Sequence, residues 1–95
     1  MEYIVDQELV ISGFDWSSLY ENDVVYLDGN FTELVIDRIG NEHTLKQKPV
    51  VIRAKNEVSI EKLVIEKCYN LVFDGDTRIS INQINNYISD DLAKD

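Results

Sequence analysis

Three stretches of the sequence repeat one pattern, a short apolar run that enters a polar turn. The runs span residues 24–27, 50–54 and 71–73, and Asp, Gly or Asn follows each of them. A second apolar run comes after each turn, at residues 34–36, 58–65 and 79–81, and residues 3–11 have the same plan. Because β-branched and aromatic residues dominate these short runs, the sequence predicts a mainly β fold.

The repeat has a nearly constant spacing. Val25, Val51 and Val72 occupy equivalent positions and recur after 26 and then 21 residues, close to the length of one β-solenoid coil. The best-formed unit is residues 49–54, followed by runs at 58–60, 63–65 and 69–75. Each strand of a solenoid pairs with its equivalent in the next coil, so we expect these three valines to be buried and adjacent in neighbouring strands.

Over residues 24–84 the chain thus resembles the right-handed parallel β-helix family, the fold of pectate lyases and related polysaccharide-active proteins. The resemblance implies a short β-solenoid stack. It transfers no site residues, because the calcium-binding acids and the catalytic Lys or Arg of those lyases have no matching constellation in this chain.

The ends of such a stack would expose unpaired backbone and need a cap. Residues 17–23 are expected to begin one cap. A short amphipathic helix in the tail after Asn82 is predicted as the other cap. Four apolar residues of this tail are spaced by three, one and four positions, as on one face of a helix: Ile84, Tyr87, Ile88 and Leu92. Without a cap, a homodimer through the open edge is expected. The alternative architecture is a small antiparallel β-barrel or sandwich, with hairpin turns at residues 28–30 and 74–76.

Length and composition indicate one domain, residues 1–95, with a single compact core. No apolar stretch has the length of a membrane helix and the N-terminus lacks the basic start of a secretion signal, so we predict a cytoplasmic protein or an excised piece of a longer one. The single cysteine, Cys68, excludes an intrachain disulfide, and we expect it to be a packed thiol.

The side chains that usually carry catalysis are scarce. His43 is the only histidine, and we interpret it as a solvated loop residue. The four glycines stand apart, so there is no phosphate-binding loop, and zinc would need Cys and His clusters. Asp28 and Asn30 flank Gly29, and Asp74 and Asp76 flank Gly75, in the manner of calcium ligands, but Asp and Asn also favour turns. We predict no enzyme activity, no cofactor and no metal.

The formal net charge of −9 is concentrated in the first half of the chain. Residues 1–45 contain ten acids and one base, Arg38. Such a surface repels nucleic acid and anionic membranes and attracts basic proteins. Seven acids are the candidate partner-binding residues: Asp15, Glu21, Asp23, Asp28, Glu33, Asp37 and Glu42. Four aromatic residues interleave with them, and any that are exposed are expected to be interface anchors: Trp16, Tyr20, Tyr26 and Phe31.

These features predict a non-enzymatic interaction protein, an inhibitor or adaptor whose carboxylates occupy the nucleic-acid-binding surface of a basic partner such as a phage-defence nuclease. Small size, acidity and missing catalytic residues make it similar in type to phage-encoded inhibitors, including anti-CRISPR and DNA-mimic proteins. Two alternatives remain open: a β-helix fragment of a carbohydrate-active or cell-surface protein, and an immunity protein that neutralises a basic toxin.

Overall fold

Strands dominate the structure, a computed structural model that describes residues 1–41, 43, 47–74 and 78–87. Two short helical turns precede the second strand. The elements are β1 (Glu2–Asp6), α1 (Gln7–Ser12), η1 (Trp16–Ser18), β2 (Val24–Asp28), β3 (Asn30–Asp37), β4 (Val50–Ala54), β5 (Val58–Glu66), β6 (Leu71–Phe73) and β7 (Ile79–Tyr87). The prediction of a mainly β fold is therefore confirmed.

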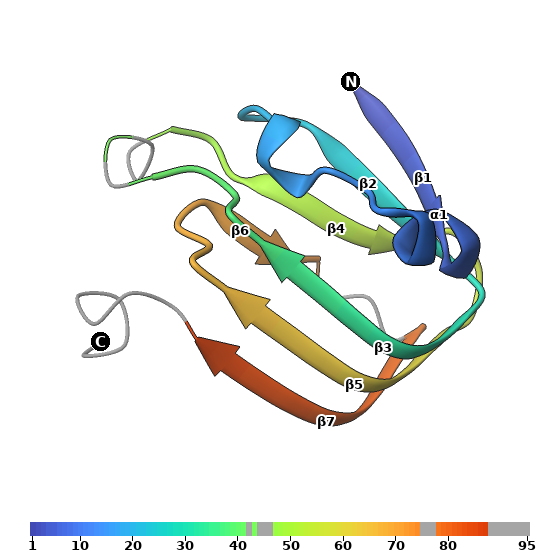
Figure 1. Cartoon of the computed structure of the whole chain (residues 1–95). Helices are drawn as coiled ribbons and strands as arrows, with labels where there is room; N and C mark the ends of the chain where they lie inside the picture. Colours follow the sequence, from blue (N-terminus) through green and yellow to red (C-terminus); the bar gives the residue numbers. More distant parts are fainter. Residues whose placement is uncertain (42, 44–46, 75–77, 88–95) are drawn as a thin grey trace.

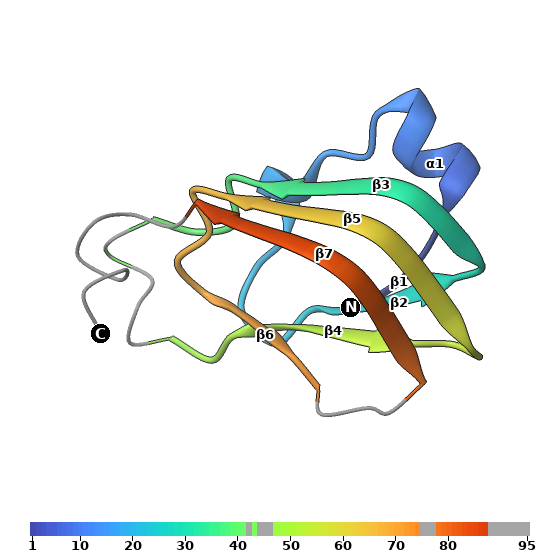
Figure 2. The ribbon, with the colours of Figure 1, turned by 90° about the horizontal axis from the view of Figure 1, so that it is seen from below.

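The strands form two sheets that face each other across one core. One sheet has the strand order β1-β2-β4-β6 and the other has the order β3-β5-β7. Figure 1 shows β3, β5 and β7 side by side, and Figure 2 shows the two sheets as separate layers. Every pairing among the described strands is parallel. The antiparallel alternative is therefore wrong.

The turn at residues 28–30 is not a hairpin, because β2 and β3 belong to different sheets. Gly29 carries the chain from one sheet to the other with a φ of 96°, a conformation that favours glycine. Of the second predicted hairpin turn, at residues 74–76, only Asp74 lies within the described residues.

The resemblance to the right-handed parallel β-helix family is wrong. The strands form two parallel sheets of four and three strands in a small globule with a radius of gyration of 12.6 Å, and the described residues do not show the coils of that family. Short apolar runs and polar turns specify strands, but they do not specify the path that connects them, and many β folds share this pattern. Equivalent runs do pair, since Val51 lies opposite Val24 and Val72.

The predicted buried column of valines is displaced by one residue. Val25 pairs with Ile52, which pairs with Phe73, and both Val25 and Ile52 are completely buried. Val51 is only half-buried and Val72 is 43% exposed, because they occupy the opposite face of the strands. A shift of one residue along a strand moves every side chain to the other face of the sheet.

The second sheet bends in its middle (Figure 2). Apolar residues three positions apart recur at the same register positions of its three strands: Phe31 and Leu34, Ile60 and Leu63, Ile81 and Ile84. Two polar residues separate each pair, and all six of them are exposed or half-buried. The three-residue spacing of these apolar pairs thus accompanies the bend of the sheet and does not indicate a helix.

The predicted C-terminal helix is wrong where the structure describes it. Residues 82–87, including Ile84, belong to β7, which pairs with β5 along its whole length. The remainder of the predicted helix, residues 88–95, lies outside the described residues.

The first part of the chain covers the free edge of β3. Residues 7–12, expected as strand, form α1 because Asp6 caps it and Gly13 ends it. Asp6 Oδ1 accepts a hydrogen bond of 2.8 Å from the Leu9 N–H, and Gly13 has a φ of 107°. Both α1 and η1 contact β3, so this cover begins earlier than the predicted residues 17–23.

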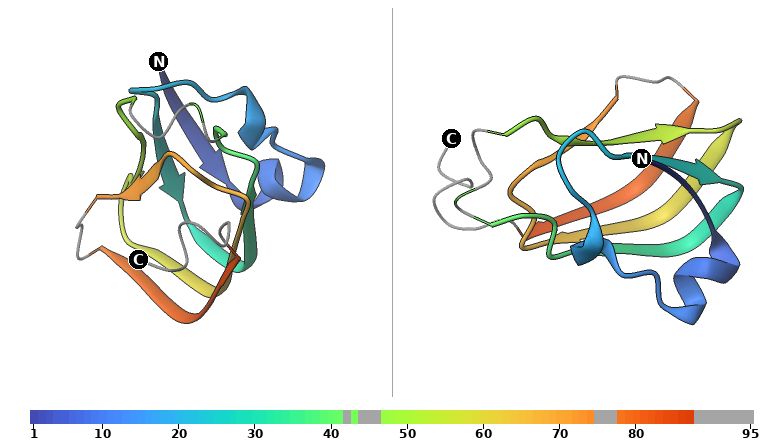
Figure 3. Two further views of the ribbon diagram at one scale, coloured as in Figure 1. Left: turned by 90° about the vertical axis from the view of Figure 1, so that its left-hand side faces the viewer. Right: turned by 90° about the horizontal axis from the view of Figure 1, so that it is seen from above.

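Figure 3 places the N-terminus and α1 at one end of the molecule and β7 at the other. At the N-terminal end, Trp16 and Leu19 close the core and are only 3% and 6% exposed. No helix in the described part of the chain has the length and apolar character needed to cross a membrane.

Candidate acidic interface

The helices, strands and connecting segments up to and including β3 contain nine acidic residues and no Lys or Arg. These elements lie together, since β1 pairs with β2 and both α1 and η1 contact β3 (Figure 1, blue to green). We call this part of the molecule, residues 1–37, the acidic end. Every Lys and Arg follows from residue 38 onward, so the charge asymmetry of the sequence becomes an asymmetry in space.

The seven predicted partner-binding residues differ widely in exposure. Three are exposed, two are half-buried, one is buried and one lies outside the described residues: Asp15, Glu21 and Glu33, then Asp28 and Asp37, then Asp23, then Glu42. The structure brings Glu33 and Asp37 to one groove and leaves the other described members on separate elements.

Asp23 is part of the structural framework. Its carboxylate lies 2.9 Å from the Met1 ammonium and accepts a 2.8 Å hydrogen bond from the Tyr20 N–H. Burial acts to raise the pKa of Asp23, but the hydrogen bonds from Tyr20 and the ammonium outweigh it and lower the pKa from its ordinary value. Because this carboxylate is buried and already paired, Asp23 is not available to bind a partner, although the sequence suggested it as a partner-binding residue.

Asp15 and Glu21 each support the local backbone while remaining exposed. Asp15 caps η1, and its Oδ1 accepts a 3.1 Å hydrogen bond from the Ser17 N–H. Glu21 Oε2 accepts a 3.2 Å hydrogen bond from the Lys48 N–H. A carboxylate has about four acceptor positions, so both side chains retain capacity for a partner.

An open groove of about 430 Å³ runs between α1, η1 and β3. Val10, Phe14 and Val35 supply apolar surface, and the Phe14 ring meets the Trp16 ring edge-on with a centroid distance of 4.8 Å. Glu33 and Asp37 also line the groove. Apolar surface beside carboxylates suits an Arg or Lys side chain, whose stem packs on apolar atoms while its cationic end pairs with the acid.

Both groove carboxylates already have cationic neighbours. Lys62 Nζ lies 3.7 Å from Glu33 Oε2, and Arg38 Nε lies 3.7 Å from Asp37 Oδ2. All four side chains are substantially exposed, and ion pairs of this kind contribute roughly 0–1 kcal/mol. They are therefore weak enough for an incoming cation to replace them.

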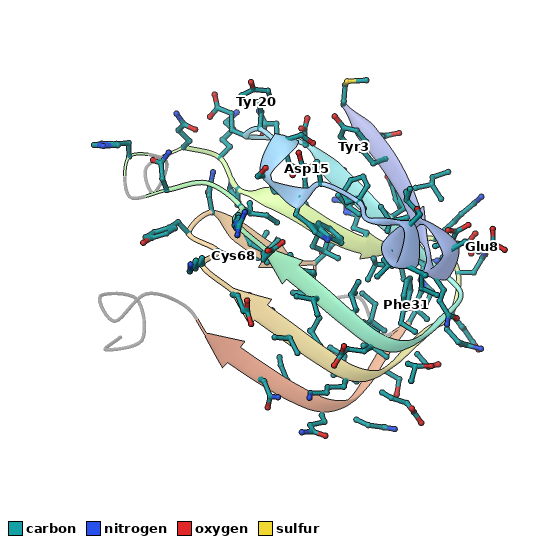
Figure 4. All side chains as sticks on the ribbon, in the orientation of Figure 1. Tyr3, Glu8, Asp15, Tyr20, Phe31 and Cys68 are labelled. Carbon is teal, nitrogen blue, oxygen red and sulfur yellow. The ribbon has the colours of Figure 1, made fainter. Side chains whose placement is uncertain are left out.

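Sequence reasoning did not select three acids that belong to the acidic end, Glu2, Asp6 and Glu8. Asp6 lies directly opposite Asp28 in the β1–β2 register, which places two carboxylates on neighbouring strands. Glu8 stands in the first turn of α1, on the outside of the molecule (Figure 4). An acid seven residues before a glycine, with another acid in between, is a helix start and stop signal that could have revealed Asp6 and Glu8.

Tyr20 is the exposed member of the four interleaved aromatic residues. It is 79% exposed and points away from the strands (Figure 4). Trp16 and Phe31 belong to the core, and Tyr26 is half-buried. Tyr20 is therefore the aromatic residue available to a partner, next to Glu21.

Cys68 is the packed thiol that the sequence predicted. It is 4% exposed, and its Sγ lies 3.3 Å from the Glu66 carbonyl oxygen and 3.5 Å from that of Ile36. Burial raises the pKa of the thiol, which disfavours the reactive thiolate. Cys68 thus contributes packing and not reactivity.

His43 is exposed, in agreement with its interpretation as a solvated loop residue. At the predicted turns, Asp74 pairs with Arg53 at 2.8 Å and Asn30 Oδ1 accepts a 2.8 Å hydrogen bond from the Ser59 hydroxyl. Among the described residues, no three His, Cys, Asp or Glu side chains are grouped so that they could hold a metal ion.

Comparison of the chain with protein-family models, with curated proteins and with solved structures finds no match. Charge, exposure and geometry are therefore the basis on which we infer a function.

Proposed function

We propose that the protein is a non-enzymatic inhibitor whose acidic end occupies the basic, nucleic-acid-binding surface of a target protein. The observation that supports this proposal is the composition of the acidic end. Residues 1–37 carry nine acids and no Lys or Arg, and eight of the nine carboxylates are exposed or half-buried. An ordinary solvated surface would intersperse the two signs of charge.

The physical basis is electrostatic complementarity. A field of one sign steers association with an oppositely charged surface and disfavours wrong partners. Carboxylates form charge-assisted hydrogen bonds with the same Arg and Lys side chains that bind phosphates. The groove beside Glu33 offers a position for one such side chain, and Tyr20 is an exposed aromatic anchor of the kind that dominates interface energies.

A protein of this kind would be similar in type to small acidic phage inhibitors, including anti-CRISPR and DNA-mimic proteins. Its target would be a protein such as a phage-defence nuclease. An immunity protein for a basic toxin would use the same surface. The two cases differ in whether nucleic acid competes for the target, because only a mimic must occupy the site where the phosphates bind.

The test uses two charge-reversal variants that change the net charge equally. Glu8→Lys with Glu21→Lys alters the acidic end, and Glu57→Lys with Glu61→Lys alters exposed acids on and beside β5. Each variant and the wild-type chain is immobilised and exposed to lysate of the cells that encode the protein, with and without duplex DNA as competitor. Mass spectrometry identifies the retained proteins.

We expect a nucleic-acid-binding protein to be retained by the wild type and by the β5 variant, lost by the acidic-end variant, and displaced by duplex DNA. If the two variants lose it equally, bulk charge is responsible and the proposal fails. If the retained protein is a toxin that DNA does not displace, the immunity alternative replaces the proposal. Circular dichroism melts of both variants control for folding. We expect a loss of about 1–2 kcal/mol for the acidic-end variant, which gives up the Glu21–Lys48 hydrogen bond and the acid in the first turn of α1, and a smaller change for the β5 variant.

A further inference from the structure

The free edge of β7 carries no charged side chain. β7 ends its sheet and, within the described residues, pairs only with β5. Its nine residues include no Asp, Glu, Lys or Arg, although 28% of the chain is charged. Proteins usually protect a long edge strand with charges or proline, since its unpaired N–H and C=O groups are a template for another strand.

Two isoleucines of β7 are exposed at positions that are buried in the neighbouring strand. Ile81 pairs with Ile60 and Ile84 pairs with Leu63, and both partners are almost completely buried. Ile81 is nevertheless 37% exposed and Ile84 is 55% exposed. Both lose cover on the side where the next strand of the sheet would lie. The edge thus combines unpaired backbone with unburied apolar side chains.

The opposite end of the same sheet is closed. The free edge of β3 is flanked by α1 and η1, which both contact it and make it less accessible to a strand from another copy. Pairing of β7 with β3 of a second molecule, which would continue as an open filament, is therefore disfavoured. Pairing of β7 with β7 uses the same surface on both copies and closes at two.

The other edges are less suitable for self-association. β1, the edge of the four-stranded sheet, carries Glu2 and Asp6, which would repel their counterparts in a second copy. β6 has only three residues. β7 also lies at the far end of the molecule from the acidic end (Figure 3), so the repulsion between two acidic chains is weakest there.

From these observations we propose that two copies of the chain associate through β7, whose free edges pair antiparallel about a twofold axis to join two three-stranded sheets into one. Ile81 and Ile84 of each copy are covered by the other copy. The dimer directs its two acidic ends away from each other, so each remains open to a partner. The inference does not depend on the function proposed above, since it concerns the opposite end of the molecule.

The test compares two lysine substitutions at edge isoleucines of equal exposure. Ile84 of β7 is 55% exposed and Ile4 of β1 is 54% exposed. Each substitution adds one positive charge to one edge strand. The wild-type chain, Ile84→Lys and Ile4→Lys are examined by sedimentation equilibrium from micromolar to near-millimolar concentration.

We expect the wild type and Ile4→Lys to shift from the 11.0 kDa monomer to twice that mass as concentration rises. Ile84→Lys should raise the dimer dissociation constant by at least about tenfold, because the twofold axis brings both lysines into the interface. In hydrogen exchange, β7 amides should gain protection with concentration while β1 amides do not.

Three results would each overturn the proposal: a monomeric wild type at the highest concentration, equal dimerisation of all three proteins, and masses beyond the dimer. Asn82→Lys provides a second variant on the same strand in case Ile84→Lys does not fold, as judged by circular dichroism.

Discussion

Truncation of three valines to alanine tests the register of the four-stranded sheet with a single chemical change. Val25 is completely buried in β2, Val51 is half-buried in β4, and Val72 is 43% exposed in β6. Each substitution removes the same two methyl groups. The differences in unfolding free energy should therefore follow burial alone.

The expected magnitudes follow from that burial. Two fully buried methyl groups are worth about 1.6 kcal/mol of transfer free energy at about 0.8 kcal/mol each, and a residual cavity adds to this, so Val25→Ala should cost about 2–3 kcal/mol. Val51→Ala should cost about half of the transfer value, roughly 0.8 kcal/mol. Val72→Ala should change stability by less than about 0.5 kcal/mol.

Urea denaturation followed by circular dichroism measures these differences, provided that the dependence on urea is the same for all variants. The ranking Val25, Val51, Val72 is the prediction. If Val51→Ala costs as much as Val25→Ala, the faces of β4 are exchanged and the register described above is incorrect. Ile52→Ala is the positive control, with an expected cost of about 2–5 kcal/mol because Ile52 is completely buried.

Three further predictions concern a buried acid, the cysteine and the charged surface. Asp23→Asn should destabilise the protein by about 1–3 kcal/mol at neutral pH. Since the folded-state pKa of Asp23 is lowered, its contribution to the free energy of unfolding is present above the unfolded pKa of about 3.9 and is lost as the pH falls through the folded-state pKa. The unfolding free energies of wild type and variant, measured in urea, should therefore become equal in acid. Cys68 should react with a thiol reagent only in urea, and rapid labelling of the native protein would contradict its burial. The on-rate for the target identified by capture should fall about tenfold or more in stopped-flow experiments as salt rises well above 0.1 M, where the screening length is about 10 Å; a constant rate would exclude steering by the acidic end.

The sequence predicted the strands well and their faces poorly. Runs of β-branched residues at 24–28, 50–54 and 71–73 became β2, β4 and β6. In each run several apolar residues follow one another, so the alternation that distinguishes an inward from an outward face is absent. Alignment by Val25 and Val51 was consequently wrong by one position.

Two helix assignments failed for local reasons. The run Leu9–Ile11 looks like a strand by composition, and only the caps at Asp6 and Gly13 make it helical. Conversely, the three-residue spacing from Ile84 to Tyr87 looks helical, yet both residues belong to β7 and pair with β5, in a sheet that bends (Figure 2). One strand read alone cannot distinguish a bend from a helical turn.

The candidate acidic interface was predictable as a charge asymmetry but not residue by residue. The absence of Lys and Arg before Arg38 is visible in the sequence. Both sheets add strands in the order of the sequence, so the first strands of each sheet lie at the same end of the molecule. The burial of Asp23 depends on contacts with Met1 and Tyr20 that no local pattern reveals. Exposure of Tyr20 and burial of Trp16 are likewise tertiary properties.

The pairing order of the strands also bears on how fast the chain folds. No described strand pairs with its neighbour in sequence except β1 with β2, and even these are separated by α1 and η1. The described strands therefore include no hairpin that could form quickly and locally as a nucleus. Each sheet contact requires closure of a loop before it is stabilised, which is typical of domains that fold in milliseconds to seconds. Because β7 follows β5 in the chain and is its second partner in the sheet, β5 is an exposed edge until β7 has been synthesised.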